Sequence, residues 1–167
     1  MLLRRIVSLA IASCVVCAGC TRKTSDRDLV FVTPFQAVEK VNTTPGLFDK
    51  KLNTVWVDPR TPELFAAGHI PGAISLPFPR MSNEAELILK GYDQFIVYDS
   101  DWEDTIGKAA SKRLMEIGFD NVFTLEGGLK AWKRDGNDVE TGVAVPADAP
   151  SSAQTAAQPP PNKPSAN

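Results

Sequence analysis

Cysteine is missing from almost all of this 167-residue chain, because Cys14, Cys17 and Cys20 are its only cysteines. The residues after Cys20 therefore hold no disulfide, no thiolate metal site and no cysteine nucleophile. Histidine is nearly as scarce, since His69 is the only one. The hydroxyls of Ser100 and Thr105 consequently have no histidine base beside them in the sequence.

An excess of positive charge is also missing. Residues 29–140 carry 12 Lys and Arg against 17 Asp and Glu, which gives this part a net charge of −5. A protein that binds nucleic acid needs a basic surface for the phosphates. The charge balance therefore argues against nucleic acid as a partner.

A long hydrophobic run is the third absence. The apolar stretch over residues 6–18 is about 13 residues long, and a membrane-spanning helix needs about 20. Arg4 and Arg5 precede this stretch, and Ala18, Gly19 and Cys20 follow it. A basic start, a short apolar run and a small-residue processing site are typical of a secretory signal.

Ala18-Gly19-Cys20 also resembles the bacterial lipobox, although Cys17 stands where that motif usually has Leu or Val. The resemblance implies a lipoprotein signal peptide over residues 1–19, cleavage before Cys20 and lipidation of Cys20, with an ordinary secretory signal as the alternative. Residues 20–29 are then a polar tether to the membrane. Thr21, by resemblance to the sorting rule of enterobacterial lipoproteins, implies the periplasmic face of the outer membrane.

The middle of the chain alternates short helical and strand patterns. Helices are predicted at residues 34–41, 63–67 and 83–90, the last with a capping box of Asn83 and Glu86. A further helix is predicted from a cap at Asp104 or Thr105 to Gly118, and another opens at Gly127. Strands are predicted at residues 52–57, 95–98 and 122–125. This alternation favours an α/β fold with a parallel sheet in one domain over residues 30–140. Residues 141–167 are rich in Ala, Pro, Ser and Gln and are predicted to form a disordered tail.

Two motifs make the fold prediction more specific. Asp58-Pro59-Arg60 precedes Phe65-x-x-x-His69-Ile70-Pro71-Gly72-Ala73, and Gly127-Gly128-x-x-x-Trp132 follows near the end of the domain. Together they resemble the rhodanese-like domain. The resemblance implies a three-layer fold, with a five-stranded parallel sheet and helices on both faces. It implies structural roles for Asp58, Arg60, His69, Gly72, Gly127, Gly128 and Trp132.

The candidate site follows the strand at residues 95–98, because open α/β sheets place their sites at the carboxyl ends of strands. Active rhodaneses carry a nucleophilic cysteine there, and the resemblance assigns that position to Asp99. The resemblance also extends to the first, non-catalytic domain of two-domain sulfurtransferases, which carries Tyr-Asp at this place. No catalytic residue is therefore predicted, and no cofactor. The loop supplies binding candidates instead: Asp99, Asp101, Trp102, Glu103 and Asp104.

Three hypotheses remain open for function. The first is a membrane-anchored, monomeric and catalytically inactive domain that binds an unknown envelope protein. The second is a sulfurtransferase-related enzyme with a cysteine-independent or partner-assisted mechanism. The third is a cation-binding acidic loop, although the spacing lacks the glycine of a calcium loop and no metal ligand set is predicted.

Overall fold

The computed structural model describes residues 23–43 and 51–142. The predictions for the signal peptide, for Cys20 and for the tail lie outside the described residues. Five strands form one sheet in the order β1-β5-β4-β2-β3, and every neighbouring pair is parallel. The strands are β1 (Phe31–Val32), β2 (Thr54–Asp58), β3 (Ile74–Ser75), β4 (Gln94–Val97) and β5 (Val122–Leu125).

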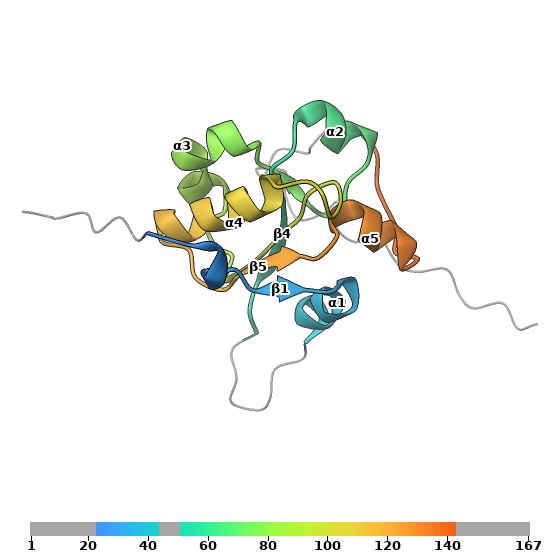
Figure 1. The fold of residues 1–167 in the computed structure, drawn as a ribbon, viewed down its shortest axis with the longest axis horizontal. Helices are drawn as coiled ribbons and strands as arrows, with labels where there is room; N and C mark the ends of the chain where they lie inside the picture. The colour runs from blue at the N-terminus through green and yellow to red at the C-terminus, as the bar shows by residue number, and fades with distance from the viewer. Residues whose placement is uncertain (1–22, 44–50, 143–167) are drawn as a thin grey trace, which may run out of the picture.

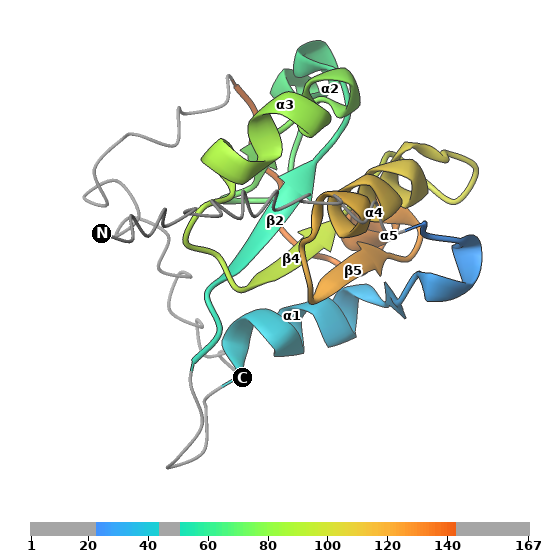
Figure 2. The ribbon, with the colours of Figure 1, turned by 90° about the vertical axis from the view of Figure 1, so that its left-hand side faces the viewer.

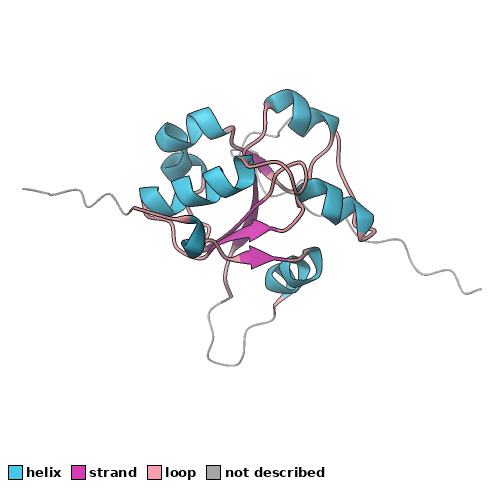
Figure 3. Cartoon of the chain, viewed as in Figure 1, coloured by secondary structure: helices cyan, strands magenta, loops and turns pink. Residues whose placement is uncertain are grey.

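Helices enclose the sheet on both faces (Figure 1, Figure 3). They are the 3-10 helix η1 (Asp26–Asp28) and the α-helices α1 (Pro34–Asn42), α2 (Pro62–Ala67), α3 (Phe78–Ile88), α4 (Ile106–Ile117) and α5 (Gly128–Arg134). α1 lies on the opposite side of the sheet from α3 and α4 (Figure 2). The predicted fold, a parallel five-stranded α/β sheet between helices, is confirmed.

The core has two halves because successive strand residues point to opposite faces. Val55, Val57 and Val97 pack with buried residues of α3 and α4 on one face. Trp56 and Ile96, which alternate with them, pack with residues of α1 and α5 on the other. β4 is buried along its whole length, so it is the central strand that holds the candidate site in place.

One predicted helix start is wrong. α3 begins at Phe78, not at residue 83, so the expected capping box of Asn83 and Glu86 does not exist. The extra turn buries Met81 against the sheet, and a proline in a first turn removes no helical hydrogen bond. Sequence reasoning left the cap of α4 open between Asp104 and Thr105. Thr105 is the N-cap residue but makes no capping hydrogen bond with its side chain. The side chain of Asp104 accepts a hydrogen bond from the Ile106 N–H at 3.0 Å instead.

The start of the described chain packs against α4. Thr24 Oγ1 donates a hydrogen bond to the Glu116 carboxylate at 3.0 Å, and Lys112 Nζ lies 2.6 Å from the Asp26 carboxylate. These residues belong to the segment that was expected to act as a tether. The tether available before the domain is therefore shorter than the sequence indicates. No helix within residues 23–43 and 51–142 has the length and hydropathy to cross a bilayer.

Candidate functional site

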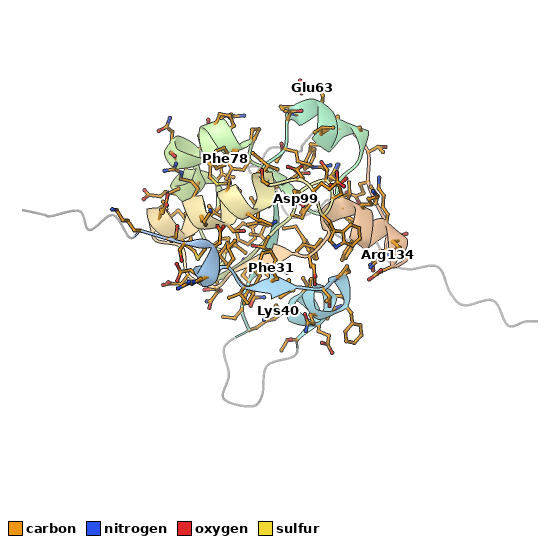
Figure 4. All side chains as sticks on the ribbon, viewed as in Figure 1. Phe31, Lys40, Glu63, Phe78, Asp99 and Arg134 are labelled. Atoms are coloured by element: carbon orange, nitrogen blue, oxygen red, sulfur yellow. The ribbon has the colours of Figure 1, made fainter. Side chains whose placement is uncertain are left out.

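The candidate site lies where β4 ends, at the centre of the carboxyl edge of the sheet. Tyr98 follows the strand, is fully buried, and accepts a hydrogen bond on its hydroxyl from the Ile70 N–H at 3.2 Å. Asp99 comes next and lies beside the first turn of α4 (Figure 4). A carboxyl-edge position between two neighbouring strands is where this class of fold binds ligands.

Asp99 is buried, with only 4% of its surface exposed. Its side chain accepts a hydrogen bond from the Gly107 N–H in the first turn of α4. Its own carbonyl oxygen accepts one from the Leu129 N–H at 2.8 Å, and the carbonyl of Ser100 accepts one from the Lys130 N–H at 3.0 Å. The free N–H groups of two helix N-termini are therefore used within the chain, by the side chain at α4 and by the loop backbone at α5.

Gly127 and Gly128, at the start of α5, make this close approach possible. A Cβ atom on Gly128 would lie 2.4 Å from the carbonyl oxygen of Asp99 and 2.5 Å from its carboxylate. A Cβ atom on Gly127 would lie 2.3 Å from the ring of Trp102. The φ angles are also positive, 71° at Gly127 and 55° at Gly128, and such angles disfavour any other residue. The sequence motif thus leaves room for the loop after β4.

Burial raises the pKa of Asp99 to about 7, and the nearby carboxylate of Asp104 adds to the rise. The hydrogen bond from Gly107 opposes this change but does not cancel it. Asp104 behaves differently: burial tends to raise its pKa, but hydrogen bonds from the N–H groups of Ile106 and Ser100 outweigh that effect and lower it. The loop therefore holds one carboxyl group that titrates near neutrality beside one that stays ionised.

The other acidic side chains of the loop mainly stabilise its own turn. Asp101 Oδ1 accepts hydrogen bonds from the N–H groups of Glu103 at 3.0 Å and Asp104 at 3.3 Å. Its second carboxylate oxygen lies 3.9 Å from Lys130 Nζ. Trp102 is 43% exposed, and the guanidinium of Arg134 lies 4.9 Å from its ring centre. Four of the five predicted binding residues thus form one structured loop, while Asp99 lies beneath it.

A small cleft of about 210 Å³ opens at this place. Asp99, Asp101, Trp102 and Asp104 line it, together with residues that sequence reasoning did not select: Phe31, Lys108, Thr124, Leu125, Glu126 and Gly127. Phe31 and Lys108 gave no signal because they come from β1 and α4, and only the folded chain brings them together. Within the two described ranges, no three His, Cys, Asp or Glu side chains are grouped so as to hold a metal ion.

Asp58 and Arg60 form a buried ion pair at the end of β2. Arg60 Nε donates to Asp58 Oδ1 at 2.9 Å, and Arg60 Nη2 donates to the carbonyl of Gly68 at 2.8 Å. The guanidinium also lies 5.4 Å from the ring centre of Tyr98. The pair thereby connects β2 with the α2 turn and with the residue before Asp99.

His69 and Trp132 also make structural contacts. His69 stacks on Phe65, with ring centres 3.8 Å apart, and its Nδ1 donates to the Phe65 carbonyl at 2.9 Å. Trp132 packs edge-on against Trp56 and donates from its ring nitrogen to the Asp138 carbonyl at 2.7 Å. Gly72 has a φ of 73° in the turn before β3. None of these residues lines the cleft beside Asp99.

The family model of the rhodanese-like domain matches residues 44–135. The chain belongs to the rhodanese-like domain family. A relative named thiosulfate sulfurtransferase GlpE, from Pseudoalteromonas translucida, is 34% identical to this rhodanese-like domain over 91 residues. The match covers 54% of this chain and 82% of the relative.

Solved structures agree on the fold. The BH2092 protein of Bacillus halodurans has a TM-score of 0.57 at 22% identity, over 69% of this chain and 79% of that one. A thiosulfate sulfurtransferase from Pseudomonas aeruginosa has a TM-score of 0.58 at 19% identity, and the match covers 72% of this chain but only 20% of that one. At these identities the likeness shows that the architecture is shared.

Proposed function

We propose that this rhodanese-like domain is a binding module without sulfurtransferase activity, anchored to a membrane of the bacterial envelope. The observation that carries the proposal is the position of Asp99. Its carboxyl group follows the central strand and accepts the Gly107 N–H at the start of α4. We infer that Asp99 stands where active relatives carry their cysteine.

Sulfur transfer requires a nucleophile that forms a persulfide, and a carboxylate cannot do this. No cysteine follows Cys20 in the sequence. The negative charge of the loop carboxylates also opposes an anionic donor such as thiosulfate. Two like charges about 6 Å apart repel each other by about 3 kcal/mol at an effective dielectric constant of ~20. Asp101 and Asp104 both lie at the cleft.

The surface above Asp99 supports a binding role. Trp102 is a large exposed side chain held from one side by Gly127 and Arg134 of α5. Because its loop is hydrogen-bonded to α5 through two backbone carbonyls, it loses little further entropy on binding. Exposed aromatic residues are enriched at protein interfaces. We propose an envelope protein as the partner.

The lipid anchor is the second part of the proposal and depends on Cys20. We propose that cleavage before Cys20 and acylation of Cys20 hold the protein at the periplasmic face of the outer membrane. Mass spectrometry of the mature N-terminus tests this. A peptide that begins with an acylated Cys20 is expected, and an uncut Met1 or an unmodified Thr21 at the N-terminus would remove the anchor from the proposal.

The loss of catalysis is tested with a thiosulfate:cyanide assay on residues 21–167, with the sulfurtransferase of P. translucida as the positive control. We expect no turnover above background. Turnover that disappears in Asp99→Asn would overturn the proposal, because the same carboxyl group would then take part in a reaction.

The binding role is tested by capture of partners from an envelope extract. Trp102→Ala should lose the partner that the native protein retains. Phe35→Ala is the matched control, because Phe35 is also an exposed aromatic residue, at 70%, but belongs to α1. Equal loss in both variants, or in neither, would argue against the loop as the contact surface.

An enzyme with a cysteine-independent mechanism is the alternative, and one observation favours it. A buried carboxyl group with a pKa of about 7 beside a cleft has the properties of a general acid or base. In that case turnover of a substrate should depend on pH with a midpoint near 7. The cation hypothesis is tested by titration with Ca²⁺ or Zn²⁺ in a calorimeter. We expect no binding tighter than millimolar, and a micromolar dissociation constant would favour the cation hypothesis.

A further inference from the structure

We propose that the face formed by η1 and the C-terminal half of α4 rests against the lipid headgroups, so that the Asp99 cleft opens away from the membrane. This inference rests on the lipid anchor of the proposed function. It adds an orientation that lipidation alone does not imply, because a lipoprotein with a long tether can rotate freely above the bilayer.

The first step is the attachment of the N-terminal segment to α4. Thr24 Oγ1 lies 3.0 Å from the Glu116 carboxylate and 3.4 Å from the carbonyl oxygen of Lys112. Asp26 pairs with Lys112 Nζ at 2.6 Å, and the Lys112 ammonium lowers the pKa of Asp26. The chain is therefore held to α4 from Thr24 onward.

The chain between Cys20 and the Thr24 contact is short. Cys20 and Thr24 are four residues apart in the sequence, so their Cα atoms lie at most about 14 Å apart. The polar layer of a bilayer is about 5–8 Å thick on each side. Crossing that layer uses about a third to a half of the available length, so Thr24 lies within about 6–9 Å of the headgroup surface, and the adjoining turns of α4 lie close to the headgroups.

The direction of α4 separates the Thr24 contact from the cleft. The helix starts beside Asp99 at the carboxyl edge of the sheet and runs back to the amino edge, where β5 begins. Glu116 lies ten residues after Ile106, which is about 15 Å along the helix axis. In Figure 1 the blue N-terminal part lies by the C-terminal end of α4, and in Figure 4 Asp99 lies toward the other end. The Thr24 contact and the cleft thus lie toward opposite ends of α4.

The charges on the two edges fit this orientation. The face at η1 and the later part of α4 carries balanced charge: Lys23, Arg27, Lys112 and Arg113 against Asp26, Asp28, Glu116 and Asp120. The loop at the carboxyl edge carries Asp101, Glu103 and Asp104 instead. Anionic headgroups therefore repel the second face more strongly than the first.

The test uses the lipidated full-length protein, purified from membranes and placed in vesicles of phosphatidylethanolamine and phosphatidylglycerol. The processed chain has no cysteine other than Cys20, whose sulfur the lipid occupies, so Arg113→Cys and Glu103→Cys each accept one fluorescent label. With a quencher on the lipid headgroups, the label at position 113 should be quenched at least threefold more than the label at position 103. Equal quenching at both positions, or the reverse order, would overturn the orientation.

A second pair of variants tests the contact that fixes the orientation. Lys112→Glu, added to Arg113→Cys, replaces the attraction to Asp26 with repulsion and should reduce quenching at position 113 toward the value at position 103. Arg134→Glu makes the same charge change in the exposed pair with Asp135 in α5 and should leave quenching unchanged. The mass of the purified protein separates the two proposals. An unacylated N-terminus overturns the anchor and the orientation together, whereas an acylated protein with uniform quenching overturns the orientation alone.

Discussion

Replacing Asp99 with asparagine should change how the stability of the domain depends on pH. Burial raises the pKa of Asp99 from 3.8 to about 7, so between these values the folded protein holds a proton that the unfolded chain has released. The free energy of unfolding therefore falls as pH rises through this range, and the loss is complete above pH 8. In Asp99→Asn this contribution is absent.

The size of the effect follows from the shift. One pKa unit corresponds to about 1.4 kcal/mol, so the full shift sets an upper limit of roughly 4 kcal/mol. Because the carboxyl group also lines an open cleft, water screens part of its charge. We therefore expect about half, or ~2 kcal/mol, as the stability gained by Asp99→Asn over the native protein between pH 4.5 and pH 8.5.

Urea unfolding followed by tryptophan fluorescence measures this difference, because the buried pair of Trp56 and Trp132 reports loss of the core. The comparison of two proteins at each pH cancels the titration of the groups that they share. Glu103→Gln removes one exposed charge from the same loop and should leave the pH dependence unchanged. Asp104→Asn removes the carboxylate that helps raise the pKa of Asp99 and should move the midpoint to lower pH.

The outcome that refutes the reasoning is a native protein and an Asp99→Asn variant whose stabilities run parallel across the whole pH range. Asp99 would then be ionised in the folded state at low pH, as an exposed carboxyl group is. Its burial between α4 and α5 would not control its charge.

Two further predictions concern stability at a fixed pH, measured by urea unfolding. Gly128→Ala brings a Cβ atom within 2.4 Å of the Asp99 carbonyl oxygen and should destabilise the domain by about 3 kcal/mol or more. Gly136→Ala, with a positive φ but no atom within 4 Å, should lose only about 1 kcal/mol, and equal losses would contradict the role of the close contact. Asp58→Asn leaves the buried guanidinium of Arg60 without its carboxylate and should destabilise by about 3–5 kcal/mol. Asp135→Asn, which breaks an exposed pair, should change stability by less than about 0.5 kcal/mol, and a similar small loss in Asp58→Asn would show that the pair is not structural.

Much of the fold was predictable because local patterns and packing agree. The predicted strand at residues 122–125 is β5, since Val122 packs with residues of α4 on one face of the sheet and Leu125 packs with residues of α5 on the other. Gly118 ends α4 with a φ of 115°, as a glycine after a helical pattern indicates. The start of α3 was missed because Pro77 and Pro79 resemble a loop in the sequence, and only the burial of Met81 shows that the helix continues back to Phe78.

The position of the site was also predictable, but its internal arrangement was not. A strand, a polar loop and a helix indicate where a parallel sheet binds ligands. Sequence reasoning grouped Asp99 with Asp101, Trp102, Glu103 and Asp104 as binding candidates of one loop. In the structure Asp99 turns inward to Gly107, while Asp101 and Asp104 accept hydrogen bonds within the loop. Asp99 can turn inward because Gly107 and Gly128 have no side chains to block its carboxylate and its carbonyl group. These two glycines are far from one another in the sequence, so only the folded chain shows their effect.

The Asp99 carboxyl group has one further consequence, for competition at the start of α4. A group attached to the chain a few ångström from its binding position acts at an effective concentration far above that of a free solute. Above pH 7, where Asp99 is largely ionised, millimolar sulfate or thiosulfate competes poorly for the Gly107 N–H. In the folded protein the Asp99 carboxylate is thus a tethered competitor of small anions at the first turn of α4.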